Sequence, residues 1–118
     1  MRKLPHRLAS WIYAVLFGCV ATYHFFILLD ADMPHAIAVR HLIFFLIDAA
    51  FAVLIWKWPR WLLIPCGLLT VQQIWSHGGH VWNAWHTGHF DAFGTFVISA
   101  LIVLMALLAR ETLMQRNT

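Results

Sequence analysis

The stretch "LASWIYAVLFGCVATYHFFILL", residues 8–29, decides the fold of this chain. An α-helix needs about 20 apolar residues to cross the roughly 30 Å hydrocarbon layer of a bilayer, and this run meets that length. The alternating pattern of a barrel strand is absent, and a helix satisfies its own backbone hydrogen bonds in lipid. The basic "MRKLPHR" before it is typical of a signal peptide. Because the apolar run continues through Leu28, we expect a retained transmembrane helix.

The composition agrees with a membrane protein. Hydrophobic residues make up 62% of the 118-residue chain and charged residues only 11%, whereas a typical soluble domain carries about 25% charged residues. Such a chain has too little polar surface to cover a globule in water. We find no phosphate-binding glycine loop and no basic nucleic-acid patch, so the expected partner is the lipid bilayer and not a nucleic acid.

Three further apolar segments follow the first. They cover residues 37–56, 60–80 and 90–109, and each is close to the length of a membrane span. The connections are short, so consecutive helices should be antiparallel neighbours. The sequence therefore predicts an all-α membrane protein, a four-transmembrane-helix antiparallel bundle that forms a single domain over residues 1–118.

Helix-breaking residues lie between the predicted spans. Pro34 suits the start of the second helix, and Pro59 suits the start of the third. Pro65 lies inside the third segment, where a proline predicts a kink. Gly78–Gly79 and Gly88 should loosen the chain before the fourth helix.

Basic residues and tryptophans predict one orientation. On one side of the predicted bundle only Arg40 carries a positive charge; the other side holds the remaining seven, Arg2, Lys3, Arg7, Lys57, Arg60, Arg110 and Arg116. Because positive charges stay inside, both termini should be cytoplasmic, in the inner (plasma) membrane of a bacterium. The tryptophans form two interfacial belts in this topology, one of Trp11, Trp56, Trp58 and Trp61 and one of Trp75, Trp82 and Trp85.

Polar residues concentrate in the predicted extracytoplasmic half. Seven of the eight histidines fall there: His24, His35, His41, His77, His80, His86 and His89. His41 and Asp48 share one helical face, and Gln73, His77 and His80 share another through i, i+4, i+7 spacing. Polar side chains within a membrane face the bundle interior. We therefore expect a polar pocket that is open to the outside.

This pocket predicts a metal or haem site. Imidazole is the commonest protein ligand of transition metals, which makes Cu, Zn or Fe the expected ion. The best candidate ligands are His24, His41, His77 and His80, and further candidates are His86, His89 and Asp91. Haem b is the other candidate, held by His24 or His41 opposite His77. Taken singly, each of these histidines is more often structural, at a helix end or at the lipid–water boundary.

Asp48 has two interpretations. An acid inside a span is costly unless it is paired or protonated. In the functional interpretation Asp48 and Gln73 either hydrogen-bond to the metal ligands and orient them or relay protons, with His41 as the neighbouring proton carrier. In the structural interpretation a neutral Asp48 is hydrogen-bonded to Gln73 or Thr22 and holds the helices together.

Three hypotheses about function remain open from the sequence. The first is a metal- or haem-binding membrane protein that acts in metal handling or electron transfer. The second is a small proton-coupled transporter that works as a homodimer through Asp48. The third is a non-catalytic accessory subunit of a larger membrane complex. The sequence does not decide whether the protein is an enzyme.

Overall fold

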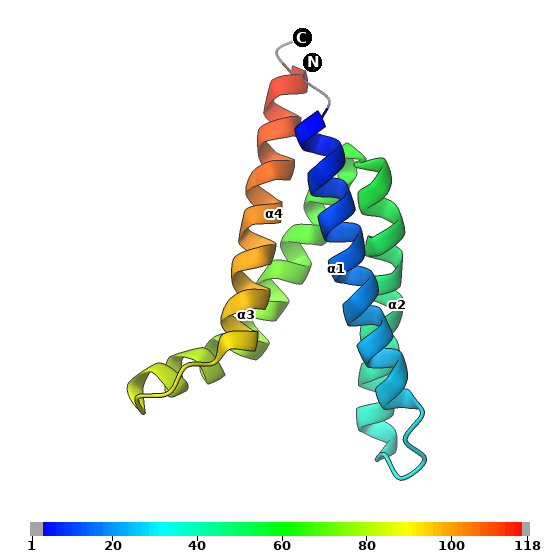
Figure 1. Ribbon diagram of the computed structural model, residues 1–118, viewed down its shortest axis with the longest axis vertical. Coiled ribbons are helices and arrows are strands. Elements are labelled where there is room, and N and C mark those ends of the chain that lie inside the picture. The colour runs from blue at the N-terminus through cyan, green and yellow to red at the C-terminus, as the bar shows by residue number, and fades with distance from the viewer. Residues whose placement is uncertain (1–3, 117–118) are drawn as a thin grey trace. The chain divides into compact units, whose positions relative to one another are not determined.

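The computed structural model describes residues 4–116, and four α-helices account for most of them (Figure 1). The helices are α1 (Leu4–Leu28), α2 (His35–Lys57), α3 (Leu63–His86) and α4 (Ala92–Arg116), with a short 3-10 turn η1 (Arg60–Leu62) before α3. No strand occurs between residues 4 and 116. The all-α prediction is therefore confirmed for this part of the chain.

Three of the helices are long and apolar enough to cross a membrane. These segments are Leu8–Leu28, His35–Lys57 and Ala92–Met114. Most of the side chains within them are not buried by other parts of the protein. An apolar surface of this extent needs lipid or another apolar partner to cover it.

The chain divides into two compact units, Met1–Pro59 and Arg60–Thr118. The first contains α1 and α2, and the second contains η1, α3 and α4. The single domain over residues 1–118 remains a prediction.

The first unit is an antiparallel helical hairpin. Aromatic contacts join α1 to α2 along its length: the Trp11 and Trp56 ring centroids lie 4.3 Å apart, and those of Phe17 and Phe51 lie 5.0 Å apart in a stacked arrangement. In the connecting turn the backbone N–H of Asp32 donates to the Asp30 carboxylate at 3.1 Å. This side-chain acceptor stabilises a tight turn between the two helices.

The residue that caps the C-terminus of α2 has a strained backbone conformation. Trp58 has φ 48° and ψ 51°, and its backbone N–H donates to the Leu54 carbonyl oxygen at 3.2 Å. A bulky residue rarely adopts this left-handed conformation, and Pro59 follows it directly. The helix break that the sequence predicts near Pro59, between the second and third helices, is confirmed.

The observed start of α3 changes the effect that Pro65 is expected to have on the helix. Because α3 begins at Leu63, Pro65 lies in its first turn and not in its interior. Backbone N–H groups in the first turn have no acceptor within the helix, so a proline there removes no hydrogen bond. Pro65 therefore gives no physical reason to expect a kink in the interior of α3.

Helices α3 and α4 of the second unit approach closely at Gly94. A Cβ atom added to Gly94 would lie 2.5 Å from Oδ2 of Asp91 and 2.9 Å from Cγ2 of Val81. Both distances are shorter than real contacts to carbon, so a larger residue here would require the Asp91 and Val81 side chains to shift. The Asp91 carboxylate also accepts a hydrogen bond from the Gly94 backbone N–H at 2.9 Å. Asp91 therefore caps the N-terminus of α4, which explains why the helix begins at Ala92.

Helix α3 continues beyond the apolar span that the sequence predicts to end near residue 80. It passes through Gly78–Gly79 and ends at His86. Gly88 then adopts φ 74°, and the backbone N–H of His89 donates to the Ala84 carbonyl oxygen at 2.8 Å. These are the features of a Schellman C-cap, in which a left-handed glycine ends the helix.

Candidate functional site

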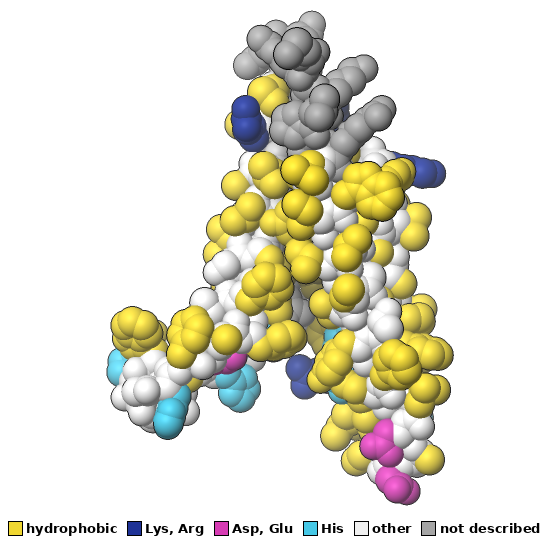
Figure 2. All heavy atoms as spheres, viewed as in Figure 1, with side chains coloured by type: hydrophobic (Ala, Val, Ile, Leu, Met, Phe, Trp, Pro, Cys, Tyr) yellow, Lys and Arg dark blue, Asp and Glu magenta, His cyan; other side chains and the backbone are white. Residues whose placement is uncertain are grey.

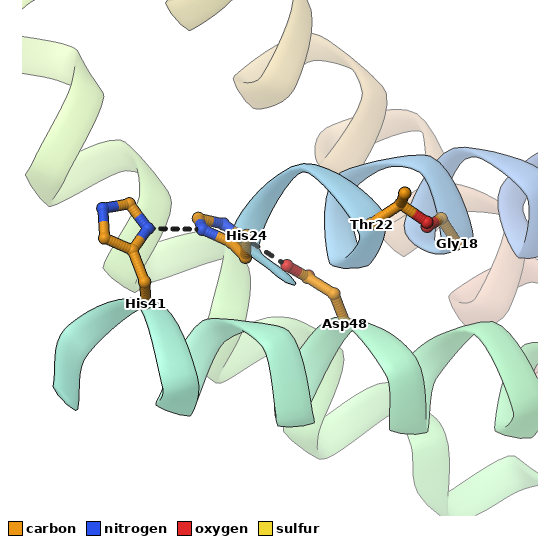
Figure 3. A network of polar contacts seen from close by, with 5 residues as sticks. All are labelled: Gly18, Thr22, His24, His41 and Asp48. Atoms are coloured by element: carbon orange, nitrogen blue, oxygen red, sulfur yellow. Dashed lines mark hydrogen bonds and ion pairs between the residues drawn. The ribbon is translucent and has the colours of Figure 1, made fainter. Parts of the chain in front are cut away.

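Three polar side chains meet between α1 and α2, within the first unit (Figure 3). Nδ1 of His24 lies 2.7 Å from Nδ1 of His41. Nε2 of His24 lies 3.7 Å from Oδ2 of Asp48. His24 comes from α1, and the other two residues come from α2. The three groups therefore form a row, with His24 in the middle and both of its ring nitrogens facing a partner.

The contact between the two imidazoles constrains their protonation. At 2.7 Å the two Nδ1 atoms are at hydrogen-bond distance, so one must carry a hydrogen and the other must present a lone pair. At least one ring is therefore neutral in this arrangement. If both rings were fully protonated, two N–H groups would face each other and the contact would break.

The His24 ring is held in place by its neighbours on α2. His41, Phe44 and Asp48 follow i, i+3, i+7 spacing, so they lie on one face of the helix. The Phe44 ring is stacked on the His24 ring, with centroids 5.5 Å apart and an interplanar angle of 20°. The Arg40 guanidinium carbon lies 5.8 Å from the centre of the Phe44 ring. Sequence reasoning missed Phe44, although its spacing from His41 would have identified it.

Both ends of the His24–Asp48 contact are shielded from solvent. The side chain of Asp48 is 8% exposed and that of His24 is 15% exposed. The gap of 3.7 Å is longer than a direct hydrogen bond, and a shift of about 1 Å in either side chain would close it. Asp48 is therefore a buried acid whose polar neighbour at this distance is an imidazole nitrogen.

The structural interpretation of Asp48 required Thr22 or Gln73 as its partner. The Thr22 hydroxyl instead donates to the Gly18 carbonyl oxygen, one turn back in α1, at 2.8 Å (Figure 3). This local bond is a common arrangement for a threonine within a helix. Gln73 belongs to the second unit.

The remaining candidate ligands belong to the second unit and make local contacts. The His77 ring meets the Phe93 ring edge-on, with centroids 5.7 Å apart. The His86 ring lies 4.3 Å from the Trp82 ring, and its Nδ1 is 2.9 Å from the Trp82 carbonyl oxygen. His80 and His89 are exposed, and Asp91 caps α4. Of the predicted site residues, the structure thus brings together His24, His41 and Asp48 within one unit.

The donor atoms of this cluster lie along a line and do not surround a common point. A metal ion needs its ligand atoms about 2.0–2.3 Å from one centre, but His24 uses both ring nitrogens in opposite directions. Among the side chains that the structure describes, those of residues 8–114, no group of three or more His, Cys, Asp or Glu is arranged to hold a metal ion. Binding of Cu, Zn, Fe or haem b therefore remains a prediction from the sequence.

No protein-family model matches this chain, and no curated protein or solved structure is similar enough to count as a match.

Proposed function

We propose that this chain is an integral membrane protein whose helices form an antiparallel four-helix bundle, with both termini on the cytoplasmic side of a bacterial inner membrane. Three helices of sufficient length and hydropathy support the membrane location. The distribution of Lys and Arg, seven against one, supports the orientation. In this arrangement His41 lies nearer the outer surface than Asp48, because α2 runs inwards from its start at His35.

Within this framework we propose that the protein is a small proton-coupled transporter, in which His41, His24 and Asp48 form a proton relay. The observation that carries the proposal is the row itself, with nitrogen to nitrogen at 2.7 Å and nitrogen to oxygen at 3.7 Å. A buried acid inside a membrane helix is costly and is typically found on an ion or proton pathway. Histidine carries both a donor and an acceptor nitrogen, so it can receive a proton on one side and release one on the other.

One proton can pass along the row from His41 to Asp48 in successive transfers. In the starting state the hydrogens are on Nδ1 of His41 and Nε2 of His24, and Asp48 is a carboxylate. A proton from the outside binds Nε2 of His41, and the hydrogen on its Nδ1 passes to Nδ1 of His24. The hydrogen on Nε2 of His24 then passes to Asp48. One proton has moved from the outside to Asp48, and both rings have changed tautomer.

A relay agrees with this geometry better than a metal site does. The groups of a proton relay must each lie next to the following one, whereas the ligands of a metal must all point to one centre. His24 has one ring nitrogen towards His41 and the other towards Asp48, which is the requirement for a middle relay group. Replacing His24 should therefore interrupt the path without removing either end.

His24→Phe is expected to lower proton uptake into proteoliposomes at least about tenfold, because phenylalanine keeps the ring but carries no proton. The measurement uses the full chain reconstituted with a pH-sensitive dye inside the vesicles and an imposed pH gradient. The matched control is His35→Phe, at the exposed start of α2, which should keep the uptake of the unsubstituted protein.

Elemental analysis and an absorption spectrum of the same preparations distinguish the alternative. A bound transition metal or a haem absorption band that disappears in His24→Phe, with no proton uptake by the unsubstituted protein, would replace the relay with a metal centre. Equal uptake by His24→Phe and the unsubstituted protein would also overturn the proposed function.

A further inference from the structure

The C-terminal part of α3 and the loop that follows it have an unusual composition. Residues 75–90, "WSHGGHVWNAWHTGHF", contain three tryptophans and four histidines but no Asp, Glu, Lys or Arg. We call residues 75–90 the aromatic segment. Helix α3 is absent from the helices that are long and apolar enough to span a membrane, so the aromatic segment differs chemically from the other three helices.

The large side chains of this segment are mostly exposed. Trp75 is 89% exposed, Trp82 68%, Trp85 73% and Phe90 70%. At 100° per residue the three tryptophans fall within about 80° of one another around the helix. Figure 2 shows hydrophobic and histidine side chains gathered at this end of α3.

A different side of the same segment packs against α4. His77 contacts Phe93, and the side chain of Val81 lies close to Gly94. Figure 1 shows that the last turns of α3 bend away from α4 before the chain returns to it. The sequence has Gly78–Gly79 in this part of the helix, and a glycine pair is a common place for a helix to bend. The tryptophan face is therefore presented outwards from the second unit.

We propose that the aromatic segment binds the headgroup layer of a phospholipid bilayer and lies within that layer. Indole combines a large apolar ring with one N–H donor, so it is most stable where apolar chains meet polar headgroups. The imidazole of His86, which lies against the Trp82 ring at an interplanar angle of 43°, adds polar groups at the same level. A segment without fixed charge fits zwitterionic lipid, since it offers no anionic or cationic partner.

This inference depends on the membrane location in the proposed function but not on the proton relay. Helix α4 follows α3 directly and is long and apolar enough to cross a membrane, so a headgroup layer at the start of α4 would lie beside the aromatic segment. The two proposals can therefore fail independently. If the tryptophans lie at another depth, the proton relay through His24 and Asp48 is unaffected. If no proton uptake is measured, the depth of the tryptophans is unaffected.

The test measures the depth of each tryptophan by fluorine NMR. The full chain is labelled with fluorotryptophan and reconstituted into phosphatidylcholine nanodiscs, and each resonance is assigned by a single Trp→Phe substitution. Three paramagnetic probes are compared: a lipid labelled near the headgroup, a lipid labelled at the chain end, and a water-soluble chelate. Ile102→Trp, on an exposed site of α4, provides the reference for the bilayer centre.

For Trp75, Trp82 and Trp85 we expect broadening by the headgroup-level probe to exceed that by either other probe about threefold or more. Ile102→Trp should respond most to the chain-end probe. Strongest broadening of the three by the water-soluble chelate would mean that the segment is outside the membrane and free to bind a protein. Strongest broadening by the chain-end probe would mean that it crosses the membrane. Either result would overturn the proposal.

Discussion

Asp48→Asn should reduce proton uptake into proteoliposomes at least about tenfold, since an amide cannot receive the proton that a carboxylate receives. Asparagine has nearly the same volume as aspartate, so the hairpin should keep its packing around the substituted site. Removing a buried acid also removes its desolvation cost, so the variant should be at least as stable as the unsubstituted protein. Loss of uptake without loss of stability is the signature of a relay residue.

The matched control is Asp32→Asn in the turn between α1 and α2. Asp32 is exposed, and the carboxylate that accepts the hydrogen bond in this turn belongs to Asp30 and not to Asp32. This variant removes the same charge from the same hairpin and should leave uptake unchanged. If Asp48→Asn and Asp32→Asn gave equal uptake, Asp48 would have only a structural role.

The second large effect concerns stability. Phe51→Ala should destabilise the hairpin by about 3 kcal/mol, because it leaves a cavity where two rings stack. Phe51 is buried, and its ring centroid lies 5.0 Å from that of Phe17 with an interplanar angle of 22°. In lipid the loss comes mainly from contacts between the packed side chains, since the surrounding chains are as apolar as the core. The midpoint of unfolding in a denaturing detergent, followed by circular dichroism, measures this loss.

Val53→Ala is the control for the packing prediction. Val53 lies two residues further along α2, and its side chain is 65% exposed. Its truncation should change the free energy of unfolding by less than about 0.5 kcal/mol. Equal losses from Phe51→Ala and Val53→Ala would contradict the packing of α1 against α2.

Hydropathy predicted the helices better than it predicted where they end. The apolar run of residues 37–56 closely matches α2, His35–Lys57, because Pro34 and Pro59 bound both. The third helix was harder, since its last turns, ending at His86, are polar and aromatic. A hydropathy pattern reports how favourably side chains transfer from water into lipid. A helix, in contrast, ends where its backbone is capped. Here the left-handed Gly88 makes that cap.

The candidate site could be predicted only in part. The spacing of His41 and Asp48 places both on one face of α2, and this follows from helical geometry alone. The contact of His24 with both residues depends on the register of α1 against α2, which the Phe17–Phe51 stack helps to set and which no spacing within one helix reveals. The role of Asp91 was missed because a capping acid and a ligand acid look alike in a sequence.

The most direct test of the relay is the hydrogen bond between its two imidazoles. In protein labelled with nitrogen-15 histidine, solution NMR should detect scalar coupling between Nδ1 of His24 and Nδ1 of His41 near neutral pH. The coupling should disappear on acidification, when both rings carry a hydrogen at this position, and it should be absent from His41→Gln. Two uncoupled Nδ1 atoms near neutral pH, each exchanging its hydrogen freely with water, would contradict a connected path from His41 to Asp48.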